Sequence, residues 1–319
     1  MPSSPTRVPS ISAVVPVYNS EGTLDELLAR LEPVLRGLTD DYEVILVNDG
    51  SRDRSWAVVQ QLARTRPWVR GIDLMRNYGQ HNALLCGVRH ARGDMVVTLD
   101  DDLQNPPEEI PKLLARLAEG FDVVYGTPDR ETHGLWRNLA SRLTKRILEG
   151  AMGVDIGRNV SAFRVFRRSL RTAFVDYRSP FVSLDVLLTW ASTRFAAVTV
   201  RHESRRVGAS NYTLARLVLH ALNMMTGFST WPLRLASLAG FGFTLLGVLV
   251  FLFVVGRYLI QGGVVPGFPF LASIIAIFGG AQLFALGVIG EYLGRLHYRM
   301  MERPTYAIRD QTSSGPEAG

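Results

Sequence analysis

The sequence predicts an α/β domain with a mostly parallel, Rossmann-like sheet, followed by two helices that cross a membrane. In the first half of the chain, short apolar runs rich in Val and Ile alternate with amphipathic helical patterns, which is typical of an open parallel sheet. In the second half, two long segments are apolar on every face. A helix needs roughly 20 such residues to cross the hydrocarbon core of a bilayer.

Five strands are predicted, at residues 11–17, 43–49, 69–74, 94–100 and 121–127. Helical patterns lie between them, at residues 24–35, 55–64 and 108–120. Ligands bind beyond the carboxyl ends of the strands in such sheets. The polar residues that follow each strand are therefore the first candidates for a functional site.

The composition excludes several classes of protein. Of the 319 residues, 47% are hydrophobic and 20% are charged, so the chain is neither disordered nor collagen-like and is more apolar than an ordinary soluble enzyme. The net charge is +6, and 33 of the 35 basic residues are Arg. Codon bias explains this excess of Arg over Lys at least as well as phosphate binding does. Cys86 is the only cysteine, which excludes an internal disulfide and a multi-cysteine metal site.

The two apolar segments lie at residues 235–256 and 266–290, and the connector between them carries one charged residue, Arg257. Several Arg residues flank the pair on both outer sides, and the first ten residues contain no secretory signal. The positive-inside rule then places the N-terminal domain and both termini in the cytoplasm, on one side of a membrane that the hairpin crosses twice. The expected location is the inner (cytoplasmic) membrane. Two buried helices of a soluble core are the alternative, although such helices are seldom apolar on every face.

The expected organisation has five parts. They are a disordered N-terminus (1–10), the α/β domain (11–210), an interfacial helix (211–232), the two membrane helices (233–291) and a cytoplasmic tail (292–319).

Three successive carboxylates, Asp100 to Asp102, follow the fourth strand. They repel one another, and a hard divalent cation relieves the cost of bringing them together. Asp100 and Asp102 can converge on one ion, with the amide oxygen of Gln104 as a further ligand, and oxygen ligands suit Mg²⁺ or Mn²⁺. A solvated turn that caps the following helix is the alternative.

Polar residues also follow the first two strands. Tyr18 can stack on a base or be a half-buried aromatic, and Asp49 can accept from a nucleotide or form a simple Asp-Gly turn. Together with the acidic turn, these residues indicate a pocket for a nucleotide diphosphate-sugar. No dinucleotide-binding or P-loop glycine motif is present.

A strongly basic stretch at residues 129–171 contains Leu135, Leu139, Leu143 and Ile147 at four-residue spacing. This pattern favours an amphipathic helix at a membrane surface over one packed on the domain core, and residues 212–228 are expected to lie along the membrane as well. A lipid phosphate would suit such a surface, whereas a nucleic-acid partner is not expected. The candidate phosphate ligands are Arg130, Arg137, Arg164 and Arg205.

Several motifs resemble the family-2 glycosyltransferases of the GT-A fold: PVYN at 16–19, DGS at 49–51 and LDDDLQNPPEEIP at 99–111. RNYGQHNAL at 76–84, GEYLGR at 290–295 and RPTYAI at 303–308 resemble the polyprenyl-phosphate glycosyltransferases within that family, in particular the undecaprenyl-phosphate aminoarabinose type. The resemblance covers nearly the whole chain. It implies an inverting, metal-dependent transfer from a nucleotide sugar, with a UDP donor expected, to a polyprenyl phosphate, and it implies a homotetramer.

The resemblance also implies roles for matching positions. Residues that would line the donor are Pro16, Tyr18, Ser20, Val47, Asp49, Asp100 and Asp101. Asp102 and Gln104, with Asp100, would hold the metal, and Arg205 would meet the diphosphate or the acceptor phosphate. The expected catalytic residues are Asp100, Asp102 and Arg205, with Arg130 as the nearest substitute for an Arg that the family has at position 128. A phosphate monoester is largely dianionic at neutral pH, so a strong general base is not required.

Four positions depart from the family pattern. Ser20 replaces a Glu, Pro128 replaces an Arg, Arg158 replaces an Asp and Asn211 replaces a Lys. Asp155 lies near Arg158 and is an alternative base.

Three other functions are alternatives. One is a processive polysaccharide synthase, but the QxxRW motif of such enzymes is not present. The others are a nucleotidyltransferase and a non-catalytic membrane-tethered nucleotide-binding protein.

Overall fold

The computed structural model describes residues 9–128, 160–179, 182–203, 231–261, 267–301 and 303–312. These residues belong to two compact units. One unit holds the sheet and contains the described residues up to 203 together with 303–312. The other contains the described residues from 231 to 301, which form two long helices.

The sheet has the order β7-β5-β6-β4-β1-β2-β3-β8 among the described strands. These strands are β1 (Ile11–Val17), β2 (Tyr42–Asn48), β3 (Val69–Leu74), β4 (Met95–Thr98), β5 (Val123–Pro128), β6 (Arg164–Arg167), β7 (Phe195–Val200) and β8 (Ile308–Gln311). β6 pairs antiparallel with β4 and β5, and β8 pairs antiparallel with β3. The remaining pairs are parallel.

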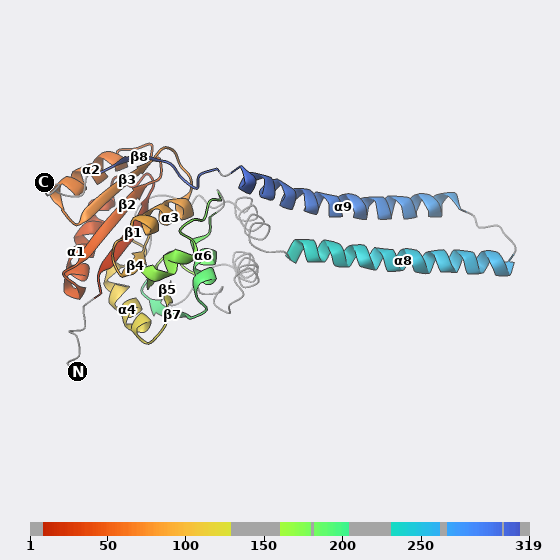
Figure 1. Cartoon of the computed structure of the whole chain (residues 1–319), viewed down its shortest axis with the longest axis horizontal. Coiled ribbons are helices and arrows are strands. Elements are labelled where there is room, and N and C mark those ends of the chain that lie inside the picture. Colours follow the sequence, from red (N-terminus) through yellow and green to blue (C-terminus); the bar gives the residue numbers. More distant parts are fainter. Residues whose placement is uncertain are drawn as a thin grey trace. The chain divides into compact units, whose positions relative to one another are not determined.

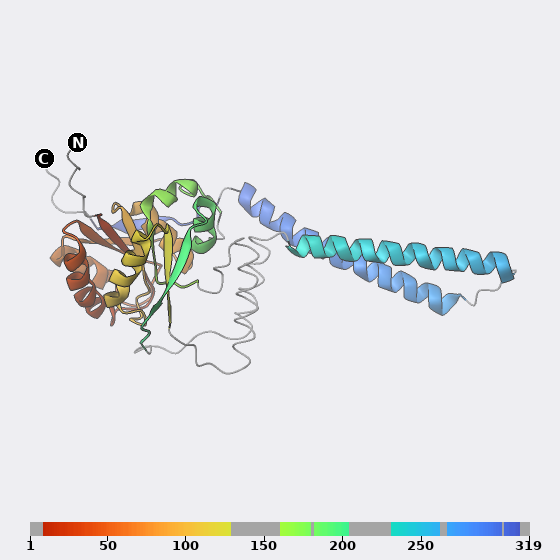
Figure 2. The same cartoon turned by 90° about the horizontal axis from the view of Figure 1, so that it is seen from below.

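Helices cover both faces of the sheet (Figures 1 and 2). They are α1 (Leu24–Leu38), α2 (Ser55–Thr65), α3 (Gln80–His90), α4 (Ile110–Ala118) and α6 (Leu184–Ala191), with short 3-10 turns η1 (Pro107–Glu109) and η3 (Arg168–Ala173). α1, α2 and α4 pack on one face, and α3 and α6 pack on the other. Successive strand residues point to opposite faces, so Val15 joins one core cluster and Val14 the other.

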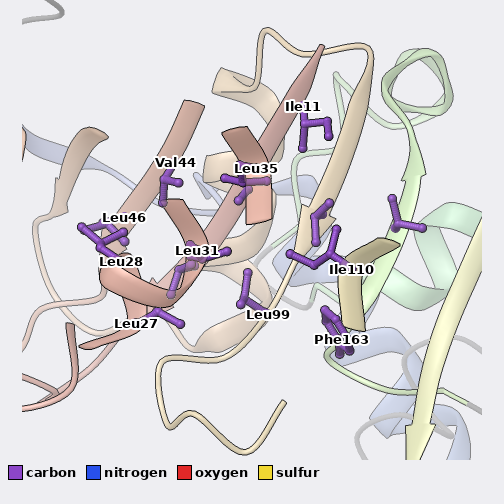
Figure 3. Close-up of a cluster of buried hydrophobic side chains, with 14 of the residues drawn as sticks. Ile11, Leu27, Leu28, Leu31, Leu35, Val44, Leu46, Leu99, Ile110 and Phe163 are labelled. Atoms are coloured by element: carbon purple, nitrogen blue, oxygen red, sulfur yellow. The ribbon is translucent and has the colours of Figure 1, made fainter. Parts of the chain in front are cut away.

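The core cluster under α1 is shown in Figure 3, where Leu27, Leu28, Leu31 and Leu35 face the strands. These leucines recur at intervals of three and four residues, so a helix places them on one side, and all four are fully buried. The same spacing predicted this helix from the sequence. Burial of these leucines against β1 and β2 holds α1 on this face of the sheet.

The predicted fold class is confirmed: a mostly parallel sheet precedes two long apolar helices. β1 and β3 have the predicted bounds, and β4 is shorter because Leu99 and Asp100 already belong to the following loop. Five elements were not predicted from the sequence: β6, β7, β8, α3 and α6. The expected interfacial helices, at residues 135–147 and 211–232, lie almost wholly outside the described residues.

The second unit consists of α8 (Trp231–Gln261) and α9 (Phe268–Met300), which contact each other through an edge-to-face pair of Phe243 and Phe278 with ring centroids 5.9 Å apart. By length and composition, both helices can cross a membrane. The most apolar run of 18 residues has a mean hydropathy of 2.6 within Pro232–Ile260 and of 1.3 within Ile277–His297. α9 continues ten residues beyond the predicted end of the second apolar segment, to Met300.

The segment after α9 returns to the sheet. β8 extends the sheet at β3, and Thr305 is buried beside it. Arg89 of α3 donates from Nη1 to Thr305 Oγ1 (3.2 Å), and Arg309 donates from Nη2 to the carbonyl of Met75 (2.6 Å). Part of the expected tail is therefore an integral edge of the sheet.

A buried ion pair holds the β5–β6 half of the sheet to α6. Arg164 donates from Nη1 to Asp185 Oδ1, and the Tyr125 hydroxyl donates to the same carboxylate (3.0 Å). Arg164 is 1% exposed and Asp185 is 4% exposed. A buried charge that loses its partner is strongly destabilising, because it is no longer compensated.

We expect Asp185→Ala to destabilise the sheet unit by about 3–5 kcal/mol, since it leaves the Arg164 guanidinium buried without its carboxylate. The measurement is the thermal unfolding midpoint of the detergent-solubilised full chain. Glu32→Ala, which removes a pair with Arg36 on the exposed side of α1, is the matched control and should leave the midpoint unchanged. Equal midpoints for the two variants would contradict a structural role for the buried pair.

Candidate functional site

The site lies where the carboxyl ends of β1, β2 and β4 meet. β1 is flanked by β2 on one side and by β4 on the other, so the strand order reverses there. Loops that follow strands at such a switch point form a crevice. Here these loops are residues 18–23, 49–54 and 99–106, which carry most of the candidate donor and metal residues.

Asp101 joins the loop after β4 to the loop after β1. Its Oδ2 accepts from the backbone N–H of Tyr18 (3.2 Å) and from the hydroxyl of Ser20. Burial raises the pKa of Asp101 to about 6, although both hydrogen bonds favour the ionised form. The carboxyl group of Asp101 therefore faces the first loop rather than a shared metal position.

Asp49 shapes the loop after β2. Its two carboxylate oxygens accept from the backbone N–H groups of Tyr78 (2.7 Å) and Gly79 (2.8 Å), and the residue is 3% exposed. Burial raises its pKa, against the effect of the two amide donors. The next residue, Gly50, has φ +63°, and a Cβ there would lie 2.5 Å from the carbonyl carbon of Arg76, so only glycine allows this approach.

The amino-terminal end of α3 contacts the acidic turn. Gln80 donates from Nε2 to Asp100 Oδ1 (2.6 Å). The neighbouring His81 accepts from the backbone N–H of Leu184 at Nδ1 (3.3 Å), which ties α3 to α6. Gln80 lies in the RNYGQH motif but was not predicted to be a site residue.

The acidic turn itself has an unusual backbone. Leu103 has φ +60° and is 2% exposed, and Asp102 Oδ1 accepts from the backbone N–H of Gln104 (3.1 Å). A left-handed conformation is uncommon for a residue other than glycine. The turn follows β4 at the same edge of the sheet at which the other two loops follow β1 and β2.

The residues present fit a cation that is coordinated partly by the protein and partly by the oxygens of a diphosphate. The described residues contain no group of three or more His, Cys, Asp or Glu side chains that could enclose a metal ion. Mg²⁺ usually takes one or two protein carboxylates and completes its coordination with phosphate oxygens and water. Asp100, Asp102 and Gln104 supply oxygen donors of that kind.

Several predicted site residues are brought together, and others are not. Tyr18 is 44% exposed, and its backbone N–H and the hydroxyl of Ser20 both donate to Asp101, which begins the acidic turn with Asp100. Pro16 and Val47 are paired neighbours on β1 and β2, and both are buried. The side chain of Val47 packs in the core against α3, so its position does not support a contact with a nucleotide.

Arg164 requires a correction. It was predicted as a phosphate ligand, but it lies on β6 inside the domain and pairs with Asp185. A basic stretch in the sequence does not reveal that one of its arginines has a buried partner 21 residues later. The predicted residues Arg130, Arg137, Asp155, Arg158, Arg205 and Asn211 lie outside the described residues.

The sheet is mostly parallel, and polar loops meet at its switch point. These features place the protein in the class of α/β proteins that bind ligands beyond the strand ends. Residues 12–174 match the sequence model of glycosyl transferase family 2, and the chain belongs to this family. It is therefore a glycosyltransferase with a GT-A fold.

Two curated relatives are similar over almost their full length. An undecaprenyl-phosphate 4-deoxy-4-formamido-L-arabinose transferase of Pseudomonas paraeruginosa is 38% identical over 317 residues, which cover 98% of this chain and 94% of the relative. The protein of the same description from Shewanella sediminis is 38% identical over 304 residues, covering 94% and 92%.

Solved structures support the fold. Glucosyl-3-phosphoglycerate synthase of Mycobacterium tuberculosis, in complex with Mn²⁺, UDP and glucosyl-3-phosphoglycerate, aligns with a TM-score of 0.53 at 22% identity. The alignment covers 68% of this chain and 78% of that protein.

We expect Asp101→Asn to flatten the pH dependence of stability. The folded state raises the pKa of this carboxyl to about 6, above the ordinary value of about 3.9. Its contribution to stability is therefore fully present below about pH 4 and is lost as the pH rises through about 6. The asparagine oxygen can still accept both hydrogen bonds, but the side chain no longer titrates.

The measurement is the unfolding midpoint of the full chain in EDTA, from about pH 5 to about pH 7.5. The exposed residue Asp40 provides the control variant Asp40→Asn, which should keep the wild-type slope. A slope for Asp101→Asn equal to that of the wild type would show that Asp101 titrates as an ordinary surface carboxylate.

Proposed function

We propose that this glycosyltransferase transfers a sugar from a nucleotide sugar to a polyprenyl phosphate such as undecaprenyl phosphate. The similarity to a relative named for transfer to undecaprenyl phosphate carries the proposal. It covers 98% of this chain and so includes α8 and α9 as well as the sheet. The chemistry of the loops at the switch point agrees with a nucleotide-sugar donor.

The donor would bind in the crevice between the three loops. Tyr18, exposed at the mouth, would stack on the base, while Asp49 would keep the loop after β2 against residues 78–79. A UDP-linked donor is favoured, because a neighbour with the same fold is described in complex with UDP and Mn²⁺.

A divalent cation, Mg²⁺ or Mn²⁺, would be held by Asp100, Asp102 and Gln104 together with the diphosphate. When bound, it would supply positive charge that stabilises the departing nucleoside diphosphate. The role of the protein's own residues is to present these oxygens in a fixed turn. Gln80 contributes by holding Asp100 through its side-chain amide (2.6 Å).

The acceptor needs charge neutralisation more than a base. A phosphate monoester, whose second pKa is about 6, is largely dianionic at neutral pH and is already a nucleophile. Attack from the face opposite the leaving group gives inversion at the sugar. Arg130, Arg137 and Arg205 remain our proposed ligands for the phosphates, and Arg164 is no longer among them because Asp185 holds it in the domain interior.

The hairpin would cross the inner membrane twice, with the sheet unit and both termini in the cytoplasm. β8 and β1 belong to one sheet, so both ends of the α8–α9 pair connect to the same unit. A chain that leaves and returns to one side crosses the bilayer an even number of times. The bilayer would present the lipid acceptor, and the assembly would be a homotetramer. The basic helix at residues 135–147 and the segment 211–232 would lie at the membrane surface.

The test is to incubate the purified full chain with Mg²⁺ or Mn²⁺, a panel of nucleotide sugars and undecaprenyl phosphate. We expect a single glycosyl-phospholipid and the release of a nucleoside diphosphate, both lost in EDTA. Formation of polymer would indicate a processive synthase, release of pyrophosphate a nucleotidyltransferase, and no turnover a non-catalytic protein.

We expect Asp102→Ala to lower the transfer rate by roughly 100-fold or more, since groups that stabilise developing charge contribute about that much. Membrane insertion, measured by membrane fractionation, should remain intact. Asp40→Ala changes an exposed aspartate elsewhere and is the control. Transfer at the wild-type rate by Asp102→Ala would defeat the metal assignment.

A further inference from the structure

The segment that follows β7 lies against the acidic turn. The backbone N–H of Glu203 donates to the carbonyl of Gln104 (2.9 Å). Residues 201–203 are the last ones described before the stretch of chain that leads to α8. The turn that carries Asp102 and Gln104 is therefore tied directly to this segment.

One guanidinium group fixes the segment in place. Arg30 of α1 donates from Nε and Nη2 to the two oxygens of Glu108 (2.9 and 2.8 Å). It also donates from Nη1 and Nη2 to the two oxygens of Glu203 (3.3 and 2.9 Å). The Arg30 side chain is 20% exposed, and its hydrogen bonds lower the pKa of Glu108. Arg30 thus bridges the segment and the η1 turn with four charge-assisted hydrogen bonds.

A second ion pair makes the same connection. Arg201 donates from Nε to Glu109 Oε1 (2.7 Å), and Lys112 donates to the other oxygen of the same carboxylate. The Glu109 side chain is 2% exposed. Segment 201–203 is therefore joined to η1 at both ends, and η1 begins three residues after Gln104.

The turn needs such support. Leu103 has a left-handed backbone (φ +60°), a conformation that persists for a non-glycine residue only where the surroundings impose it. Burial of the Leu103 side chain and the hydrogen bond between Asp102 and the N–H of Gln104 hold it from within. The bond from Glu203 to the carbonyl of Gln104 holds it from outside.

We propose that Arg30 and Glu203 are positioning residues that hold the turn 102–104 in the shape that binds the cation. In this proposal neither side chain is a ligand of the donor or the cation, and both act through the Glu203 backbone on Gln104. This inference rests on the proposed function, because it assumes that Asp102 and Gln104 hold a metal. The competing view is that these ion pairs only stabilise the domain.

The experiment measures Mn²⁺ binding rather than turnover. Free Mn²⁺ is followed by electron paramagnetic resonance during titration of the full chain in detergent with saturating UDP. We expect Arg30→Leu to weaken Mn²⁺ binding by roughly tenfold or more, as is usual for residues that orient metal ligands. Glu203→Gln keeps the backbone donor but loses the charge, and should weaken binding to a smaller extent.

Arg36→Leu is the matched control, because Arg36 lies on the same helix and pairs with Glu32 (2.7 Å) at an exposed position. It should bind Mn²⁺ as the wild type does. Arg30→Lys should restore part of the affinity, because lysine keeps the charge but not the planar fork. The unfolding midpoint of each variant is recorded alongside, and Glu203→Gln decides the question if Arg30→Leu does not fold.

Unchanged Mn²⁺ binding in Glu203→Gln and in folded Arg30→Leu, with only a lower unfolding midpoint, would overturn the positioning role. That result would leave the proposed function intact. A wild-type chain that binds no Mn²⁺ in the presence of UDP would instead overturn the metal assignment on which the inference rests.

Discussion

The parallel pairing of β1 with β4 is the constraint on which the site depends. It places two strands that are far apart in the sequence side by side, from Ile11 with Met95 to Val14 with Thr98. The loops that follow them must then meet, and Asp101 makes the contact with Tyr18 and Ser20. Without this pairing the acidic turn and the PVYN loop would be two unrelated surface turns.

Three adjacent carboxylates at one strand end would be unfavourable if all faced the same point. The fold separates them by giving each a different donor: Gln80 for Asp100, the first loop for Asp101, and the N–H of Gln104 for Asp102. Asp100 and Asp102 remain the pair suited to a cation, while Asp101 serves the junction between loops.

Local patterns predicted α1, because its buried leucines recur at helical spacing on one face, and β1, because it is a short apolar run that is buried on both faces. They missed α3, whose buried residues run without a break from Asn82 to Val88, so no amphipathic face marks it. Gly87 within it is required by packing, since a Cβ there would lie 2.3 Å from Val14 Cγ1. β8 was missed because its residues, IRDQ, are mostly polar and its strand character comes only from pairing with β3. In the site, the acidic turn was predictable from its residues, whereas the partners of Asp101 and Arg164 depend on distant pairing.

The return of the chain to the sheet makes the helix pair an insertion within the sheet unit. β7 and β8 lie at opposite edges of one sheet, and α8 and α9 come between them in sequence. β8 can pair with β3 only after both helices have been synthesised, and closing so long a loop costs entropy that the short, polar strand recovers poorly alone. The buried Thr305, its bond to Arg89 and the bond from Arg309 to Met75 supply the additional contacts.

Both segments that border the helix pair are thus anchored on elements that carry the site, since 303–309 contacts α3 and 201–203 contacts the acidic turn.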